Sequence, residues 1–168
     1  MTDATTTQSA DEQPLVKVVL VQEYEDGDES DVESPWALEL GNDQYQLKNF
    51  PFFFYGLSYN DIFEARPSPE YPDDPRPYFV KLIEKSGHRT ARVFMTASIQ
   101  ESEAAKQALD ELKAMYCGYE GNGDNFFVIN IQPHCDFEAV VKFLDDNEHI
   151  EAWEMADPVD EEANESGS

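Results

Sequence analysis

Hydrophobic and polar positions alternate most clearly in a short stretch near the middle of the first half of the chain. Trp36, Leu38 and Leu40 occupy every second position. Ala37 and Glu39 fill the positions between them. A period of two is typical of a strand with one buried face. The pattern therefore predicts a strand whose tryptophan and leucines face the core.

The segment that follows predicts the partner strand of a hairpin. Gly41-Asn42-Asp43 turns the chain, because glycine and asparagine tolerate a positive φ at little cost. Tyr45 and Leu47 then alternate with polar residues, as in a second strand. Pro51 ends that strand, since proline lacks the amide donor that a central strand needs.

Other segments before residue 98 also have the character of strands. The acidic run 23–33 predicts a solvated loop, and the proline-rich run 66–77 predicts an exposed loop of extended character. Short strands joined by tight turns indicate a small, curved antiparallel sheet or a small β-barrel over 15–97. The further strands are expected at 15–21, 62–65, 78–85 and 89–95.

The pattern then changes to a repeat of three to four residues. Ser98-Ile99-Gln100-Glu101 fits a capping box, and apolar residues at helical spacing follow as far as Tyr116. Gly118 and Gly121 are expected to end this helix. Asp136 is the expected N-cap of a second helix.

Two strands complete the second half. Residues 126–131 form a continuous apolar run that predicts an internal strand, and 150–155 alternate as an edge strand does. The order β-α-β-α-β from Arg89 to Met155 is the order of a ferredoxin-like (split βαβ) layer with two helices.

These elements predict an α+β fold in which a β-rich unit is followed by the two-helix layer. The expected parts are a disordered acidic N-terminal tail (1–14), a barrel-like subdomain (15–97), the layer (98–157, sharing strand 89–96) and a disordered acidic tail (158–168).

Length and composition place the chain among small soluble proteins. Its 168 residues suit one domain or two small subdomains, and no apolar run approaches the roughly 20 residues that cross a bilayer. The first residues lack the basic and apolar regions of a signal peptide. We therefore expect a cytoplasmic protein with no membrane partner. The two cysteines, Cys117 and Cys135, have no disulfide or CxxC pattern and are expected to be reduced.

Charge is the strongest property of the composition. Eleven basic residues against 36 acidic ones give a formal net charge of −25. Such a charge argues against binding to a phosphate backbone, so no nucleic-acid partner is expected. Two interpretations stay open. One is a solubilising, self-repelling surface of the kind that halophilic proteins use, and the other is an acidic decoy that steers toward a basic partner.

The densest polar cluster lies at the turn before residue 89. Ser86 and His88 flank Gly87, and Arg92 follows on the next strand. Histidine titrates near neutral pH, and arginine binds carboxylates or phosphates in bidentate fashion. The alternative is that Ser86 and His88 bond to the local backbone. No GxSxG, phosphate-binding loop or HExxH motif accompanies them.

A second polar group precedes this cluster in the sequence. It consists of Asn49, Tyr55, Ser58, Tyr59 and Asp61, where the asparagine and aspartate also fit ordinary turn caps. We expect these residues to line one cleft with His88 if they have a function.

Metal and cofactor sites are not predicted. The adjacent pair His134 and Cys135 points to opposite faces of an extended chain, and no histidines or cysteines have ligand spacing. Aromatic residues are denser: Phe50, Phe52, Phe53 and Phe54 cannot all face inward from one strand. One or two of them are expected to form an exposed apolar patch that marks a partner site.

The same residues carry a family resemblance. The string Trp36…Tyr45-x-Leu47-x-Asn49-x-Pro51-Phe52…Tyr55-Gly56-Leu57-Ser58-Tyr59-x-Asp61, followed by Ser86-Gly87-His88-x-Thr90-x-Arg92, resembles the bacterial and archaeal domain-of-unknown-function family 4265. The likeness covers most of 15–155. The proline loop and the residues Phe50 and Phe54 depart from the family pattern. The resemblance supports the boundaries and the clustered polar residues, and it implies no activity.

We interpret the chain as a non-enzymatic, cytoplasmic protein-binding or regulatory module that contacts a protein partner through an aromatic–acidic surface. Two alternatives stay open. The first is a small-ligand sensor or enzyme that uses a cleft of His88, Arg92 and Asp61. The second is an acidic, antitoxin-like or nucleic-acid-mimic inhibitor.

Overall fold

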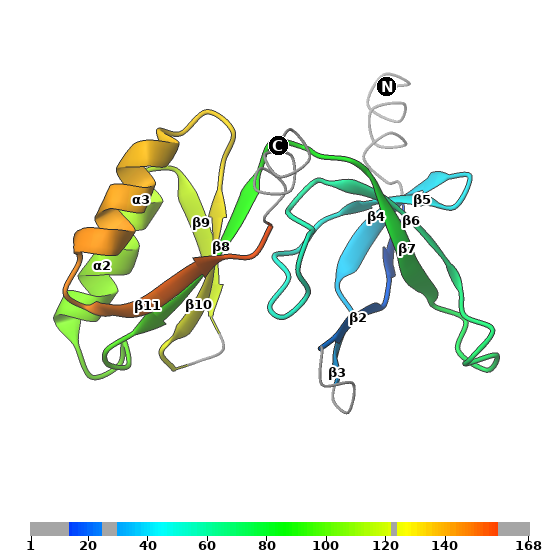
Figure 1. The fold of residues 1–168 in the computed structure, drawn as a ribbon, viewed down its shortest axis with the longest axis horizontal. Helices are drawn as coiled ribbons and strands as arrows, with labels where there is room; N and C mark the ends of the chain where they lie inside the picture. The colour runs from blue at the N-terminus through cyan, green and yellow to red at the C-terminus, as the bar shows by residue number, and fades with distance from the viewer. Residues whose placement is uncertain (1–13, 25–29, 122–123, 158–168) are drawn as a thin grey trace, which may run out of the picture.

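Two units lie side by side in the computed structural model, which describes residues 14–24, 30–121 and 124–157 (Figure 1). In these residues the first unit consists of strands, and the second combines strands with two helices. The predicted α+β class with mostly antiparallel sheets is therefore confirmed. The two predicted acidic tails lie outside the described residues, apart from Pro14.

An open antiparallel sheet forms the body of the first unit. Its strand order is β1-β4-β5-β6-β7, so β1 and β7 are the edges. A parallel bridge between Val19 and Tyr78 joins the β7 edge to the chain before β2. The described strands do not close into a barrel, and of the two predicted alternatives the open sheet is the one observed. The strands are β1 (Leu15–Lys17), β4 (Trp36–Gly41), β5 (Gln44–Leu47), β6 (Ile62–Pro67) and β7 (Pro77–Glu84).

The predicted hairpin is formed by β4 and β5. Asn42 and Asp43 have φ values of 58° and 64°, the left-handed conformation that a tight hairpin turn requires at both central positions. The buried face of β4 is the opposite of the predicted one. Ala37 is buried opposite Leu47, whereas Trp36 is 42% exposed. Residues paired across two strands share a face, so the buried leucine of β5 brings the alanine of β4 into the core.

The expected strand 15–21 and the expected loop 23–33 also differ from the structure. The strand is divided into β1 and β2 (Leu20–Glu23), with Val18 and Val19 buried between them. β2 pairs with β3 (Ser30–Glu33), so much of the acidic run belongs to a hairpin. Acidic side chains on the open side of a two-stranded ribbon stay solvated, and charge alone does not distinguish such a ribbon from a loop.

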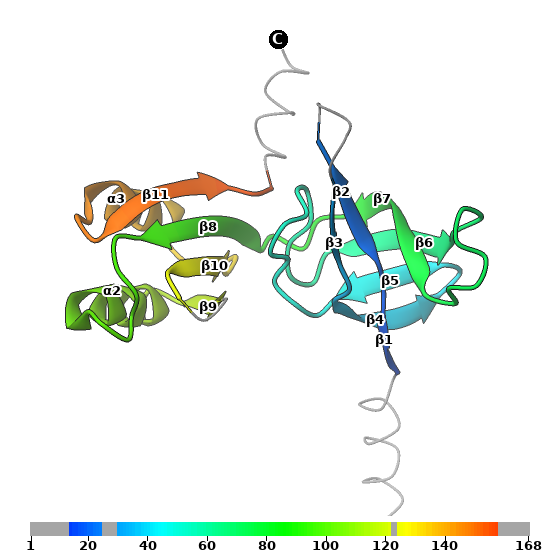
Figure 2. The same ribbon diagram turned by 90° about the horizontal axis from the view of Figure 1, so that it is seen from below.

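A four-stranded antiparallel sheet with two helices on one face forms the second unit (Figures 1 and 2). Its strand order is β11-β8-β10-β9, and Figure 2 shows these strands one above another in that order. The elements follow the chain as β8 (Arg89–Met95), α2 (Glu103–Ala114), β9 (Cys117–Gly121), β10 (Phe126–Ile131), α3 (Phe137–Asp146) and β11 (Ile150–Met155).

The second unit contains one strand more than the sequence predicted. Tyr116, with a φ of 66°, reverses the chain directly after α2, and Gly118 and Gly121 lie within β9 instead of ending the helix. Small residues let other groups approach β9 closely, because an added Cβ at Gly118 would lie 3.3 Å from the ring of Phe50. The strand therefore has few of the bulky residues that normally indicate one.

Each unit has a hydrophobic core of its own, and the two faces of the second sheet have different neighbours. The face toward α2 and α3 is apolar, whereas Thr90, Arg92 and Asn130 are buried polar residues on the other face, toward the first unit. The core of the first unit contains Val18, Leu20, Ala37, Tyr45, Leu47, Phe54, Leu57, Phe63 and Ala65. The core of the second contains Ala91, Val93, Met95, Ala105, Ala108, Leu109, Leu112, Cys117, Phe127, Ile129, Ile131, Val140 and Leu144.

Side-chain caps start both helices. The Asp136 side chain accepts a hydrogen bond from the Ala139 amide (3.2 Å), so the predicted cap of α3 is confirmed. The cap of α2 is Ser102, whose side chain accepts from the Ala105 amide (3.1 Å). The predicted capping box at Ser98 is wrong, because that residue belongs to a separate turn closed by the Glu101 amide. In the described part of the chain, neither helix is long and apolar enough to cross a membrane.

Replacing Ser102 by alanine is expected to lower the free energy of unfolding by about 1 kcal/mol, because α2 loses the acceptor for one of its first amides. The matched change Ser98→Ala is expected to have an effect below about 0.5 kcal/mol. Urea unfolding followed by circular dichroism measures both. An equal loss in the two variants would contradict the assignment of the cap.

Candidate functional site

The segment Phe50–Tyr55, called the aromatic loop from here on, belongs to the first unit and packs against the second. It leaves the first sheet after β5 and lies against the face of the second sheet that the helices leave free. Phe50 packs on Gly118 of β9, and Phe52 lies against Phe126 of β10 with ring centroids 6.2 Å apart. The loop therefore covers a sheet that belongs to the other unit.

Side chains of the β2–β3 hairpin hold the backbone amides of this loop. The Glu33 carboxylate accepts hydrogen bonds from three consecutive amides, those of residues 52, 53 and 54, at 2.9, 2.8 and 2.8 Å. The Gln22 side-chain oxygen accepts from the Tyr55 amide at 2.8 Å. Successive amides that point into one concavity are a strong site for an anion, and here the protein's own carboxylate occupies it.

Arg92 of β8 holds the loop from the opposite side. Its guanidinium is almost fully buried and donates to the carbonyl oxygens of Phe54 (2.5 Å) and Pro51 (3.4 Å). The Tyr55 ring lies over the guanidinium at 4.6 Å, and the Tyr55 hydroxyl donates to Glu154 of β11 (2.6 Å). Burial lowers the pKa of Arg92, whereas Tyr55 and the nearby carboxylates favour its charged form. Arg92 therefore acts as an anchor for the loop in this arrangement.

Held by these hydrogen bonds, the aromatic loop presents aromatic rings to solvent. Phe53 is 43% exposed and Tyr55 37% exposed, and Phe94 of β8 is 45% exposed beside them. The rings are linked, because Phe52 contacts both Phe53 and Phe126, and Phe126 contacts Phe94 with centroids 4.7 Å apart. We call these five residues the aromatic patch.

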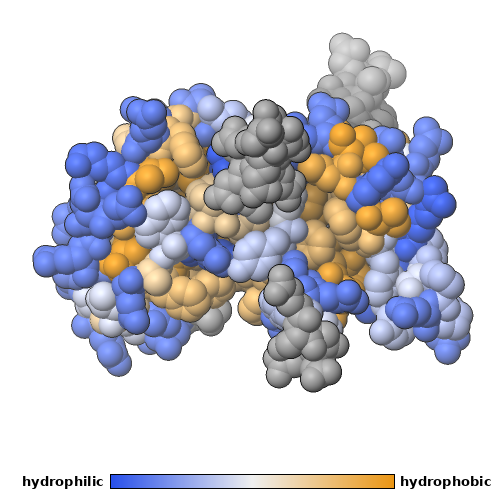
Figure 3. Space-filling view, viewed as in Figure 1, coloured by the Kyte–Doolittle hydropathy of each residue, from blue (hydrophilic) through white to orange (hydrophobic). Residues whose placement is uncertain are grey.

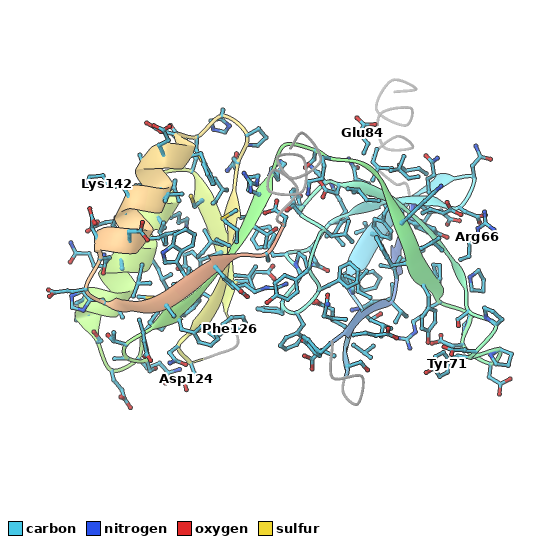
Figure 4. The ribbon with its side chains drawn as sticks, in the orientation of Figure 1. Arg66, Tyr71, Glu84, Asp124, Phe126 and Lys142 are labelled. Carbon is cyan, nitrogen blue, oxygen red and sulfur yellow. The ribbon has the colours of Figure 1, made fainter. Side chains whose placement is uncertain are left out.

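The aromatic patch lies where the two units meet. Figure 4 labels Phe126 at the foot of β10, near the middle of the molecule. On the same view, Figure 3 shows hydrophobic atoms on both sides of the junction and hydrophilic atoms over the outer end formed by the helices. Several exposed aromatic rings gathered in one area are unusual on a soluble surface and mark a site of interaction.

A buried carboxylate organises the other end of the junction. Asp61 is fully buried, and its two oxygens accept from the amides of Ser58 and Ser86, each at 2.8 Å. The Lys85 ammonium donates to the same carboxylate at 2.6 Å. The Ser86 hydroxyl donates to the Tyr59 carbonyl oxygen (2.7 Å). Every oxygen of Asp61 is thus bonded to the protein itself.

A second buried carboxylate, Asp157, joins the segment directly after β11 to this cluster. It accepts from the Ser58 hydroxyl at 2.8 Å and from the Arg89 guanidinium at 3.2 Å. Burial raises the pKa of Asp157, and the contacts with Arg89, Ser58 and Lys85 oppose that rise. Ser58 also shares a hydrogen bond with Thr90 (2.7 Å). These contacts tie β8 and the chain after β11 to the first unit.

His88 lies at the rim of this cluster. Its Nδ1 is 3.0 Å from the side-chain nitrogen of Asn130, within hydrogen-bond distance. The Tyr59 ring packs on the imidazole edge to face with centroids 5.2 Å apart. Burial lowers the pKa of His88, while the bond to Asn130 and the charge of Asp61 act in the opposite direction.

Asn49 belongs to a different place. Its side-chain oxygen accepts from the Trp36 amide (2.6 Å), and it lines a cleft between the first unit and β9. The residues proposed from the sequence therefore form three groups: Tyr59, Asp61, Ser86 and His88 lie together, Tyr55 and Arg92 lie together, and Asn49 is separate.

Several residues of the site had no signal in the sequence. Glu33 was part of an acidic run, and nothing local relates it to amides about 20 positions away. Lys85, Asn130 and Asp157 are likewise joined to the site by long-range contacts. Only a pattern that pairs distant segments would have identified them.

The described residues give little support for a reactive thiol or a metal-binding site. Burial raises the pKa of Cys117 to about 12 and also raises that of Cys135, so both thiols stay protonated at neutral pH and are poor nucleophiles. Among the described side chains, no three histidines, cysteines or carboxylates are grouped to hold a metal ion.

The part of the chain that matches a known family contains most of these residues. The model of a domain of unknown function, DUF4265, matches residues 33–155. The chain belongs to this family. The DUF4265 region includes Glu33, the aromatic loop, Asp61 and Arg92, but it begins after β2 and ends before Asp157.

A solved structure has the same overall fold as this DUF4265 protein. It is the crystal structure of a hypothetical protein from Neisseria gonorrhoeae, with a TM-score of 0.64 and 17% sequence identity. The alignment covers 85% of this chain and 94% of that one. At this identity the likeness concerns the fold alone. No curated protein matches the chain.

The exchange Asp61→Asn is expected to lower the free energy of unfolding by about 3 kcal/mol or more, because Lys85 loses the closer of its two carboxylate partners and the new amide faces three donors. Asp110→Asn on the exposed side of α2 is the matched control and is expected to change it by less than about 0.5 kcal/mol. Denaturant unfolding measures both. Unchanged stability of the Asp61 variant would show that this carboxylate has another role.

The change Glu33→Ala is expected to expose the amides of residues 52–54 to exchange, because each loses its acceptor at a cost of about 1–3 kcal/mol. Hydrogen exchange followed by NMR measures the protection of these amides. Glu39→Ala on β4 removes the same charge and is expected to leave their exchange rates unchanged. Equal rates in wild type and the Glu33 variant would contradict the anchoring of the loop.

Proposed function

We propose that this chain is a non-enzymatic, cytoplasmic protein-binding or regulatory module, and that it binds a partner protein through the aromatic patch. The observation that carries the proposal is the exposure of Phe53 on a segment whose backbone is held by Glu33 and Arg92, with Phe94 of β8 also exposed. Burying these rings against a partner is favourable, at about 25 cal/mol for each Å² of apolar surface.

The rigidity of the aromatic loop supports this role. A flexible loop loses conformational entropy when it binds, and that loss reduces affinity. Here the amides of residues 52–55 and the carbonyl groups of Pro51 and Phe54 already have partners. The rings are therefore held in place before a partner arrives, as in other preorganised interfaces.

Acidic groups at the edge of the aromatic patch favour a partner with basic character. Tyr55 donates to Glu154, and Tyr24 donates to Asp31 beside it. With a net charge of −25, the whole chain attracts cations within a screening length of about 10 Å at moderate salt. Rim charges of this kind speed association and select the partner.

The arrangement of the polar residues gives less support to a sensor or enzyme built on His88, Arg92 and Asp61. The carboxylate of Asp61 and the guanidinium of Arg92 are buried and bonded to the chain itself, and His88 contacts Asn130 instead of either. An acidic inhibitor that mimics nucleic acid is a special case of the protein-binding proposal, in which the partner is a basic enzyme.

The form of the second unit supports the same interpretation. We propose that it is a ferredoxin-like layer, supported by the element order β-α-β-β-α-β and the strand order β11-β8-β10-β9. In this arrangement both helices cover one face of the sheet, and the other face is available to carry the aromatic loop.

Replacing Phe53 by serine is expected to weaken capture of the partner at least tenfold, because a central aromatic contact is lost. The measurement is a quantitative pull-down from a lysate of the source organism at its working salt, with wild type and variants as bait. Tyr71→Ser is the control, because Tyr71 is similarly exposed but lies in the distant proline-rich loop (Figure 4).

The proposal requires proteins that wild type and the Tyr71 variant retain and the Phe53 variant loses. Identical sets of captured proteins for both variants would contradict it, as would turnover of a substrate that depends on His88.

A further inference from the structure

A cleft of about 360 Å³ opens beside the aromatic patch, between the first unit and β9. Phe52 belongs to both, so the cleft and the aromatic patch form one continuous surface. We call it the Trp36 cleft. Its lining residues are Lys17, Glu33, Ser34, Pro35, Trp36, Asn49, Phe50, Phe52 and Glu120.

Aromatic rings form the walls of the Trp36 cleft. Trp36 is partly exposed within it, and Phe50 is fixed by the Tyr59 ring (5.6 Å) and by the bare backbone of Gly118. The Trp36 ring already attracts a cation, since the Lys17 ammonium lies 4.6 Å from its centroid. Electron-rich ring faces at a partly desolvated site favour positively charged groups.

The carboxylates of the cleft are used unequally. Glu33 is bonded to the amides of the aromatic loop, whereas Glu120 has no hydrogen-bond or ion-pair partner among the described residues. Glu120 is a solvent-exposed residue, and burial of part of its side chain raises its pKa. It lies two residues after Gly118 on β9, on the face toward the first unit. A cation in the cleft would give this carboxylate the partner that the chain does not supply.

We propose that the Trp36 cleft receives an arginine side chain of the protein that binds the aromatic patch. This inference rests on the proposed function and names the group that the partner inserts. A guanidinium is flat, so it stacks against Trp36, Phe50 or Phe52, and its paired N–H groups match the two oxygens of Glu120. An ammonium is compact and strongly hydrated, and it satisfies the charge without using the aromatic walls.

Lys17 opposes this binding and provides a second variant. Its ammonium donates to the Ser34 carbonyl oxygen at 3.0 Å, which places one positive charge at the edge of the cleft. A second cation nearby is repelled, so removing this charge strengthens the binding of arginine. A purely unspecific attraction to the acidic chain predicts only a slight change for the same substitution.

The experiment uses Nα-acetyl-arginine-N-methylamide as the probe, titrated into the full chain and followed by two-dimensional NMR. The chain has two tryptophans, Trp36 and Trp153. The Trp36 indole signal is expected to shift in a saturable way. Trp153, whose indole N–H donates to Asp145 (2.8 Å) on the far side of the second sheet, is expected to stay in place and reports that the fold is intact.

Three variants separate the site from the general charge. Glu120→Gln is expected to weaken binding at least fivefold, and Lys17→Met is expected to strengthen it about threefold. Glu84→Gln removes the same charge from β7, at the place labelled in Figure 4, and is expected to bind as wild type does. The citrulline analogue of the probe has the same shape without the charge and is expected to cause no saturable shift.

Equal binding of the citrulline analogue, equal weakening by Glu84→Gln and Glu120→Gln, or a shift confined to residues outside the cleft would overturn the inference. The probe needs no partner protein, so its failure is distinguishable from failure of the proposed function. Loss of arginine binding with retained Phe53-dependent capture would refute the cleft alone. The reverse result would refute the proposed function and leave an arginine site.

Discussion

The contact between Glu33 and the three amides of residues 52–54 is the interaction on which the rest of the site depends. Those amides belong to no strand ladder, so without the Glu33 carboxylate they would turn to water and the loop would open. Arg92 completes the arrangement from the second unit by binding the carbonyl groups on the other side of the same loop. Glu33 of the first unit and Arg92 of the second thus bind the aromatic loop from two sides without contacting each other directly. This arrangement lets a short, irregular segment serve as the junction of the molecule and still leave its rings exposed.

Burying charged groups at the junction costs free energy, and their contacts show what this burial achieves. Asp61 and Asp157 are out of contact with solvent, and each carries several donors from different parts of the chain. A buried ion pair adds little stability over apolar packing, but it penalises every arrangement in which one partner is missing. Because Lys85 contacts both carboxylates, sliding one unit along the other would leave a charge unpaired. The polar cluster therefore fixes how the units sit, whereas the two hydrophobic cores stabilise each unit by itself.

The local parts of the fold could be predicted from the sequence, and the errors have identifiable causes. The hairpin of β4 and β5, the strand β10 and the cap at Asp136 depend on neighbouring residues, and they were found correctly. The buried side of β4 was assigned wrongly because the larger residues were assumed to face the core, while register placed Ala37 opposite Leu47. β9 was missed because close approach of Phe50 requires a glycine where a strand normally has a bulky residue.

The predicted site residues also divide into those positioned by neighbouring residues and those positioned by long-range contacts. Tyr59, Asp61, Ser86 and His88 lie together because two tight turns bring them close, whereas Asn49 and Tyr55, which were expected in the same cleft, lie elsewhere. Glu33 and Glu120 were not proposed, although one holds the aromatic loop and the other lines the cleft beside it. Their roles arise from pairing between the units, and an acidic chain offers so many carboxylates that charge alone selects none of them. What distinguishes these two is the backbone or ring that faces them, and that depends on how the second sheet lies against the first unit.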